Sequence, residues 1–230
     1  MTRIVEIGML KRVVPMWILL VIVAALSLGA SGPAPGQTPP PSPEFKRPAD
    51  ALFADDFSSG ELKGWRSDSL SSAWSIRDGM LRAELPNEKQ AHSFLFAGDT
   101  TWTDYAVDLD VCGMRGADKG FGVRVLHQHG LGIDLRGGTY GDVMLYVNRF
   151  RVGSGKAKNE NGSWNHMRAE MRGGRCRLLV NDHVVYDEAT RFKPPAHGGI
   201  ALAAYAGGLA ECTVYYDNVV VTPLAAASKP

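Results

Sequence analysis

The sequence has no surplus of charge of either sign. Lys and Arg number 25 against 24 Asp and Glu, which gives a formal net charge of +1. Proteins that bind nucleic acid or an anionic membrane through their overall field need a basic surplus. We therefore expect no nucleic-acid partner and no membrane contact by the folded part, although a local basic patch stays open.

Cysteine is scarce and odd in number. Three thiols cannot all pair within one chain, so in an oxidising compartment at least one stays free or pairs with another chain. All three lie within predicted strands, which favours burial as small apolar residues. These residues are Cys112, Cys176 and Cys212.

Common signatures of catalysis and metal binding are also missing. The sequence contains no nucleophile elbow, no phosphate-binding glycine loop and no zinc-ligand spacing. His127 and His129 flank Gln128 and could contact one metal from a strand. Because no third ligand lies near them in the sequence, we favour a role at the end of a strand.

Long apolar runs are absent except for residues 13–30, which carry no charge and follow a basic stretch. This length lies between a signal-peptide core and a bilayer span. Residues 1–30 are therefore predicted to be a signal peptide, which the small residues before Ala30 favour, or a retained anchor helix. Both place the rest of the chain outside the cytoplasm, as a secreted, periplasmic or membrane-anchored protein.

Aliphatic residues are almost absent from residues 31–50, which are rich in proline. Such a segment cannot bury enough apolar surface to fold, so we expect an extended linker that holds the domain away from the membrane or the cleavage site. Residues 223–230 are predicted to be a disordered tail. One domain is left, over residues 51–222.

Within that domain the pattern is that of β-strands. Apolar and polar residues alternate in residues 105–112, 121–125, 133–136 and 143–148. The 26 glycines fall largely between apolar runs, and Asp78-Gly79 is a strong signal for a two-residue hairpin turn. About a dozen strands at even spacing predict an all-β sandwich or barrel with few helices.

The stretch from Lys119 to Arg151 predicts three antiparallel strands with one apolar face and one polar face. A merely solvated face needs less charge and hydrogen-bonding capacity than the polar face offers, so we expect function there. Side chains at positions i and i+2 of a strand point to the same face, so Asp108 and Asp110 are also expected to share a face. The polar face gathers Arg124, Asp134, Arg136, Tyr146 and Asn148.

Several landmarks recur in a familiar order. They are DDF followed by GW, then WSIRDGML, WTDYAVDLDV, GFGVRV, WNHMRAEM and a closing YDNVVV. In this order they resemble the concanavalin A-like lectin and glucanase superfamily, with laminin-G-like domains and bacterial domains related to keto-disaccharide hydrolases as the nearest branches. The resemblance implies a jelly-roll β-sandwich of two antiparallel sheets that binds sugars on its concave sheet or rim loops. It speaks for the fold more strongly than for the chemistry.

The resemblance also suggests where catalysis would lie. Retaining glucanases of the superfamily carry an E-x-D-x-E strand, because two carboxyl groups about 5 Å apart must act as nucleophile and acid. The closest match here is Asp108-Leu109-Asp110, which lacks the final acid; the alternative is that both aspartates pair with Arg124 and Arg136. The keto-disaccharide hydrolase branch has an N-S-G-I stretch where this chain has residues 119–122, and its catalytic residues do not map onto the sequence.

A structural Ca²⁺ is the one metal that the resemblance would accommodate. The first and last strands pair in such jelly rolls, which would bring Asp56 and Asp217 together as hard oxygen ligands. We favour the simpler alternative, in which both carboxylates accept hydrogen bonds from backbone amides at strand ends. The expected cofactor is therefore none.

We predict non-catalytic recognition of a glycan or oligosaccharide, because alternating Asp and Arg neutralise one another and keep each Asp ionised. A glycoside hydrolase or keto-disaccharide hydrolase, with Asp108 and Asp110 as catalytic residues, is the alternative, and a protein-adhesion module is a third. Trp102 is the expected aromatic platform. The predicted carbohydrate-binding residues are Asp108, Asp110, Arg124, Asp134, Arg136, Tyr146 and Trp102.

Overall fold

The computed structural model describes residues 37–116, 118–137, 140–148, 150–190 and 193–225. These residues form fifteen strands and two 3-10 helices, so the all-β prediction is confirmed. The predicted leader, residues 1–30, and the end of the predicted tail, residues 226–230, lie outside the described residues. Within the described ranges, the chain has no helix with the length and apolar character needed to cross a bilayer.

Sheet A has eight strands, in the order β13-β12-β11-β6-β15-β4-β3, with β1 also paired to β15. Neighbours are antiparallel; for example, Asp110 of β6 faces His166 of β11 and Asp217 of β15. The strands are β1 (Phe53–Asp55), β3 (Trp74–Arg77), β4 (Met80–Glu84), β6 (Tyr105–Arg115), β11 (Trp164–Arg172), β12 (Arg175–Val180), β13 (His183–Ala189) and β15 (Thr213–Pro223). One 3-10 helix, η1 (Ser71–Ala73), precedes β3.

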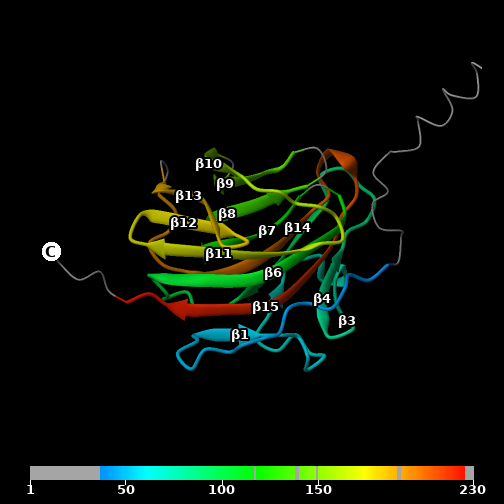
Figure 1. Ribbon diagram of the computed structural model, residues 1–230, viewed down its shortest axis with the longest axis horizontal. Helices are drawn as coiled ribbons and strands as arrows, with labels where there is room; N and C mark the ends of the chain where they lie inside the picture. Colours follow the sequence, from blue (N-terminus) through cyan, green and yellow to red (C-terminus); the bar gives the residue numbers. More distant parts are fainter. Residues whose placement is uncertain (1–36, 117, 138–139, 149, 191–192, 226–230) are drawn as a thin grey trace, which may run out of the picture. The chain divides into compact units, whose positions relative to one another are not determined.

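Sheet B has seven strands, in the order β10-β9-β8-β7-β14-β5-β2, and is antiparallel as well. In Figure 1 sheet A lies in front, with β6 and β15 near its centre, and β7, β8 and β14 of sheet B lie behind it. The strands are β2 (Arg66–Ser67), β5 (His92–Ala97), β7 (Asp118–Leu126), β8 (His129–Arg136), β9 (Asp142–Val147), β10 (Phe150–Lys156) and β14 (Gly199–Tyr205). The second 3-10 helix, η2 (Gly207–Leu209), follows β14.

The core lies between the two sheets and is built by the alternation seen in the sequence. Phe121 and Ile133 of sheet B and Leu109 and Met167 of sheet A are at most 2 % exposed and belong to one apolar cluster. The three cysteines are free and buried, as predicted. Alternation within each strand therefore sends the intervening polar or small residues to two separate outer faces, one on each sheet.

Two tight turns set the register of the hairpins. Asp78 and Gly79 both have positive φ, at 52° and 76°, and join β3 to β4 as the sequence predicts. His127 and Gln128, with φ of 47° and 66°, join β7 to β8 in the same way, so that Leu126 faces His129. The histidines thus belong to a hairpin end, as favoured above.

The proline-rich segment does not stand away from the sandwich. Trp164 of β11 donates an indole hydrogen bond of 2.8 Å to the carbonyl oxygen of Pro40, and Asn218 of β15 donates one of 2.8 Å to that of Pro43. Pro39 is buried. The prediction of a free spacer is therefore wrong for this part of residues 31–50, because Trp164 and Asn218 supply hydrogen-bond donors that composition alone does not reveal.

Candidate functional site

The outer face of sheet B carries a pocket of about 250 Å³. Its floor is made by small residues on the central strands, which leave the backbone uncovered. At Gly120 a Cβ atom would lie 1.8 Å from the carbonyl oxygen of Ile133, so only glycine fits there. The outward-facing floor residues are Gly120, Gly122, Gly132, Ala201 and Ala203.

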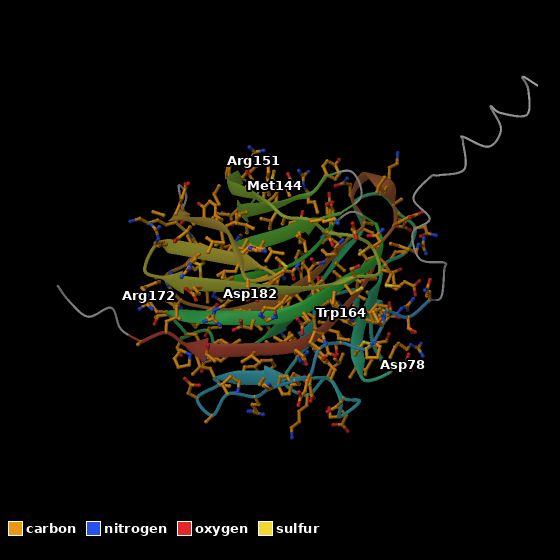
Figure 2. The ribbon with its side chains drawn as sticks, viewed as in Figure 1. Asp78, Met144, Arg151, Trp164, Arg172 and Asp182 are labelled. Atoms are coloured by element: carbon orange, nitrogen blue, oxygen red, sulfur yellow. The ribbon has the colours of Figure 1, made fainter. Side chains whose placement is uncertain are left out.

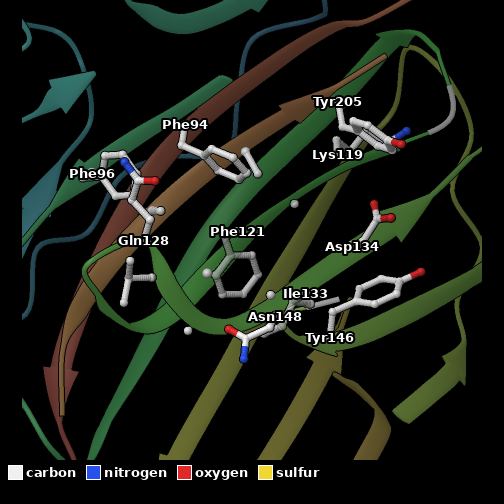
Figure 3. A pocket seen from close by; sticks show the side chains of 17 residues that line it. Phe94, Phe96, Lys119, Phe121, Gln128, Ile133, Asp134, Tyr146, Asn148 and Tyr205 are labelled. Atoms are coloured by element: carbon white, nitrogen blue, oxygen red, sulfur yellow. The ribbon is translucent and has the colours of Figure 1, made fainter. Parts of the chain in front are cut away.

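Larger side chains on the flanking strands form the walls, as Figure 3 shows. Phe94 and Phe96 project from β5 on one side, with ring centroids 6.2 Å apart, and Phe94 is 36 % exposed. Asp134 of β8 and Tyr146 of β9 stand on the other side. The contrast between a glycine and alanine floor and aromatic walls creates the hollow, because strand side chains stand roughly perpendicular to the sheet.

Asp134 is the one carboxyl group among the residues that line this pocket. Burial, and to a smaller extent the nearby charge of Asp118, raises its pKa to about 7, although Lys119 and Arg136 act in the opposite direction. The sequence argument that neighbouring arginines keep each Asp ionised is therefore wrong for Asp134, because the cost of desolvation exceeds the attraction of the cations.

Tyr146 and Arg136 border the same face. Burial, and then the charge of Asp134, raises the pKa of Tyr146, which keeps its hydroxyl protonated as a hydrogen-bond donor. Arg136 is committed to Asp142 of β9 through two hydrogen bonds, one of them 2.8 Å from Nε, and lies 4.0 Å from the ring centroid of Tyr140. Its guanidinium is therefore engaged by Asp142 and Tyr140, and Arg136 is not among the residues that line the pocket.

A second pocket of about 500 Å³ adjoins the first and shares Phe96, Val125 and Gln128 with it. Arg66 of β2 lies over the Phe96 ring at 5.7 Å from the centroid. The carboxylate of Asp68, the acidic residue of this second pocket, accepts hydrogen bonds from the Phe94 amide and the Ser93 hydroxyl, both at 2.8 Å. The two hollows together extend from β9 across the sheet to β2.

A family model described as a 3-keto-alpha-glucoside-1,2-lyase-like domain matches residues 51–222, which is most of the chain. The chain belongs to this family. A comparison with curated protein sequences finds no match.

Solved structures with the same fold superpose on the sandwich. Carbohydrate binding module CBM66 from Bacillus subtilis is 15 % identical with a TM-score of 0.57, covering 69 % of this chain and 95 % of its own. The β-glucanase of Bacillus licheniformis is 12 % identical with a TM-score of 0.57, covering 77 % and 100 %. The VIP36 exoplasmic domain bound to Ca²⁺ and Man3GlcNAc is 10 % identical with a TM-score of 0.56, covering 77 % and 90 %. At these identities the likeness shows the fold, and it confirms the predicted concanavalin A-like jelly roll.

Arg124 is not part of the polar face, contrary to the prediction. Gly199 faces Val125 whereas Ile200 faces Val123, so Arg124 is the extra residue of a β-bulge, and its φ is 50°. The bulge leaves the side chain 3 % exposed, paired with Asp104 at 2.8 Å and donating to backbone carbonyls. It is a structural ion pair away from the pocket.

Asp108 and Asp110 lie on the other sheet, so the predicted set is split between two opposite faces. Asp108 pairs with Arg168 of β11, and His166 lies 3.4 Å from Asp108 and 3.0 Å from Asp110. Hydrogen bonds to both carboxylates raise the pKa of His166 to about 10. The predicted pairing of these two aspartates with Arg124 and Arg136 is wrong. Alternation along a strand shows which residues share a face of that strand, but it does not show to which of the two sheets the strand belongs.

Trp102 is not the aromatic platform of the pocket. Its ring lies over Gly98, and its centroid is 5.9 Å from that of Tyr105 in an edge-on arrangement. It is partly buried against the main core. The aromatic side chains that line the pocket come mainly from β5, β9 and β14 instead.

The candidate metal ligands have protein partners. His129 Nδ1 lies 2.9 Å from the side-chain oxygen of Asn148. Asp56 accepts from the Ser58 amide and Asp217 from the Asn218 amide, which is the arrangement favoured from the sequence. Within the ranges that the structure covers, no group of three His, Cys, Asp or Glu side chains is placed to hold a metal ion.

Several pocket residues were missed by the sequence argument. Phe94 and Phe96 alternate with buried residues along β5, and that alternation was the available signal. The floor glycines of residues 119–122 coincide with the stretch in which the chain departs from the N-S-G-I pattern of the keto-disaccharide branch. These glycines can be recognised as the floor of a pocket only when the sheet order, with β7 between β8 and β14, is known.

Proposed function

We propose that the sandwich binds a carbohydrate in the pocket of sheet B, outside the cytoplasm, and that its main role is recognition. The observation that carries this proposal is the placing of Phe94, Tyr146 and Asp134 around a floor of small residues. A sugar ring has apolar C–H faces that stack on aromatic rings, and hydroxyl groups that pair with a carboxylate or amide. The pocket offers both kinds of contact within one hollow.

The second pocket supports a ligand of more than one ring. The two hollows share Phe96, Val125 and Gln128 as lining residues, and the second has the larger volume, about 500 Å³ against about 250 Å³. Arg66 lies over the ring of Phe96, which both pockets share. Its guanidinium can donate hydrogen bonds to a second sugar ring. A glycoside or oligosaccharide fits this shape better than a single sugar.

The names of structural relatives favour the same class of ligand. One is a carbohydrate binding module, one is a lumenal domain solved with Man3GlcNAc, and one is a β-glucanase. Recognition is preferred to hydrolysis because a hydrolase needs two carboxyl groups with separated pKa values across one bond. Asp134 has no second acidic residue beside it in the lining of the first pocket, and Asp68 of the second is held by Ser93 and Phe94.

A second candidate function is elimination, which needs one base rather than two acids. In a 3-keto-glucoside the carbonyl at C3 acidifies the proton at C2. A carboxylate takes that proton, the C1–O bond breaks, a double bond forms between C1 and C2, and the leaving oxygen is protonated. Asp134 favours this candidate, because a base with a pKa of about 7 is well matched to neutral pH. Tyr146 is the neighbouring proton donor.

Calorimetric titration and a turnover assay on glucosides and 3-keto-glucosides test the proposal together. We expect saturable binding by the wild-type protein and its loss in Tyr146→Ala. Asp182→Asn is the matched control for Asp134→Asn, since Asp182 lies in the exposed turn between β12 and β13. Turnover that disappears in Asp134→Asn but not in Asp182→Asn would show that the function is elimination and not recognition. If the protein bound neither glucosides nor 3-keto-glucosides, the proposal would be refuted.

A further inference from the structure

The outer face of sheet A carries many charged residues and one cluster of buried apolar side chains. Met80, Met114 and Tyr215 are buried there together with Cys112, and Trp164 packs against them at the edge. These residues alternate with core residues, so they face away from the interior of the sandwich. An apolar cluster on an outer face needs a cover, because apolar surface exposed to water is unfavourable.

The proline-rich segment supplies that cover. Figure 1 shows the segment, in blue, crossing in front of β4 and β15 before it reaches β1, and Figure 2 labels Trp164 and Asp78 beside it. Pro39 is buried, although its neighbours Thr38 and Pro40 are exposed. A hollow of about 450 Å³ lies between the segment and the sheet, lined by Thr38, Pro39, Pro41, Ser42, Asp78, Gly79, Met80 and Asp217.

Three polar contacts fix the segment at separate points. Trp164 Nε1 donates to the Pro40 carbonyl and Asn218 Nδ2 to the Pro43 carbonyl, each at 2.8 Å. The Ser42 hydroxyl donates to Asp217. An extended proline-rich chain leaves its carbonyl groups without internal partners, and it loses little conformational entropy when it binds. An indole donor beside an apolar surface suits such a chain.

We propose that this groove, formed by Trp164, Met80, Tyr215, Asp217 and Asn218, is a binding site for an extended proline-rich peptide. Its occupant is the chain's own residues 38–43. The linker is thereby anchored on sheet A, and the outer face of sheet B, with its pocket, stays clear of it. The groove is independent of the carbohydrate site, since the two share no residue.

The Trp164 indole proton reports on the anchor directly. In ¹⁵N-labelled full-length protein its solvent exchange rate follows the population in which the segment is released. Loss of one hydrogen bond, or of the buried ring of Pro39, shifts this equilibrium by about fivefold, the value of roughly one net hydrogen bond. We expect about fivefold faster exchange in Ser42→Ala and in Pro39→Gln. These substitutions lie in the segment, so they leave the sandwich itself intact.

Pro43→Gln is the matched control, because the Pro43 side chain is exposed and the carbonyl is kept. The indole protons of Trp65 and Trp74, which donate to Asp55 and Ser93, are internal references. We expect all three controls to stay unchanged. Equal Trp164 exchange in the wild type, Pro39→Gln and Ser42→Ala would overturn the proposal.

A second experiment tests the groove as a peptide site. Residues 37–43 are replaced by a Gly-Ser sequence in the full-length chain, and a synthetic peptide of residues 37–44 is added. We expect the peptide to slow the solvent exchange of the Trp164 indole proton, with saturation at peptide concentrations of up to several millimolar. A tethered segment has an effective concentration of about that size, so a free peptide needs a similar concentration to occupy the groove. No slowing in that range, or equal slowing by a peptide with its prolines replaced by alanine, would refute a specific site.

Discussion

The raised pKa of Asp134 predicts that removing its charge stabilises the protein at high pH. The carboxyl has an ordinary pKa of 3.8, and burial raises the pKa to about 7 in the folded protein. Below pH 3.8 both states are protonated and there is no penalty. As the pH rises toward about 7, the unfolded chain ionises first, so the folded state loses stability relative to it, and above about 7 the loss is complete.

The size of the effect follows from the shift. Each pKa unit corresponds to about 1.36 kcal/mol, so a shift from 3.8 to about 7 gives about 4 kcal/mol at pH 8. Solvent at the pocket mouth screens part of this, and we expect about 2 to 4 kcal/mol. Near pH 4 the same calculation leaves about half a kcal/mol. Asp134→Asn keeps the shape of the protonated acid and removes the ionisation.

Urea unfolding of the wild type, Asp134→Asn and Asp182→Asn at pH 4 and pH 8 measures the difference. We expect Asp134→Asn to be more stable than the wild type at pH 8 and nearly equal to it at pH 4, with Asp182→Asn equal to the wild type at both. A stability gap that does not change with pH, or a destabilised variant at pH 8, would refute the electrostatic reasoning.

Three further predictions concern the scaffold. Arg124→Met should lower the free energy of unfolding by about 2 kcal/mol in urea titrations, because it removes the ion pair with the half-buried Asp104 and the hydrogen bonds to the Thr103 and Gly173 carbonyls; a loss below about 0.5 kcal/mol would contradict the assigned ion pair. Gly120→Ala should destabilise by several kcal/mol and abolish binding, because its Cβ meets the Ile133 carbonyl; thermal unfolding checks this, and an unchanged melting temperature would count against the floor. In native protein the thiols should react with a disulfide reagent far more slowly than after unfolding, since burial raises the pKa of Cys112 to about 11, of Cys176 to about 12 and of Cys212 to about 11.

The sequence predicted the sandwich because period-two alternation is local. Phe121 and Ile133 could be assigned to a core, and Asp78-Gly79 to a hairpin, from a few neighbouring residues each. Strand pairing is not local. Asp108 and Asp134 both face outward, but the order of β6 and β8 in separate sheets places them on opposite sides of the molecule.

Two local irregularities also lie beyond pattern reasoning. The bulge at Arg124 shifts the alternation by one residue and turns an expected surface arginine into a buried one. The anchored linker depends on Trp164 and Asn218, which lie far from residues 38–43 in the chain. The composition of the linker correctly indicates that it cannot fold by itself. It cannot reveal the hydrogen-bond donors on distant strands that hold the linker in place.

The central claim is that the carbohydrate site lies on the outer face of sheet B. A crystal structure of the protein with a bound glycoside tests it most directly. We predict that the sugar ring lies over Gly120 and Gly122, between Phe94 and Tyr146, with hydroxyl groups within hydrogen-bonding distance of Asp134. A glycoside bound on sheet A beside Asp108, with the pocket of sheet B empty, would contradict the account.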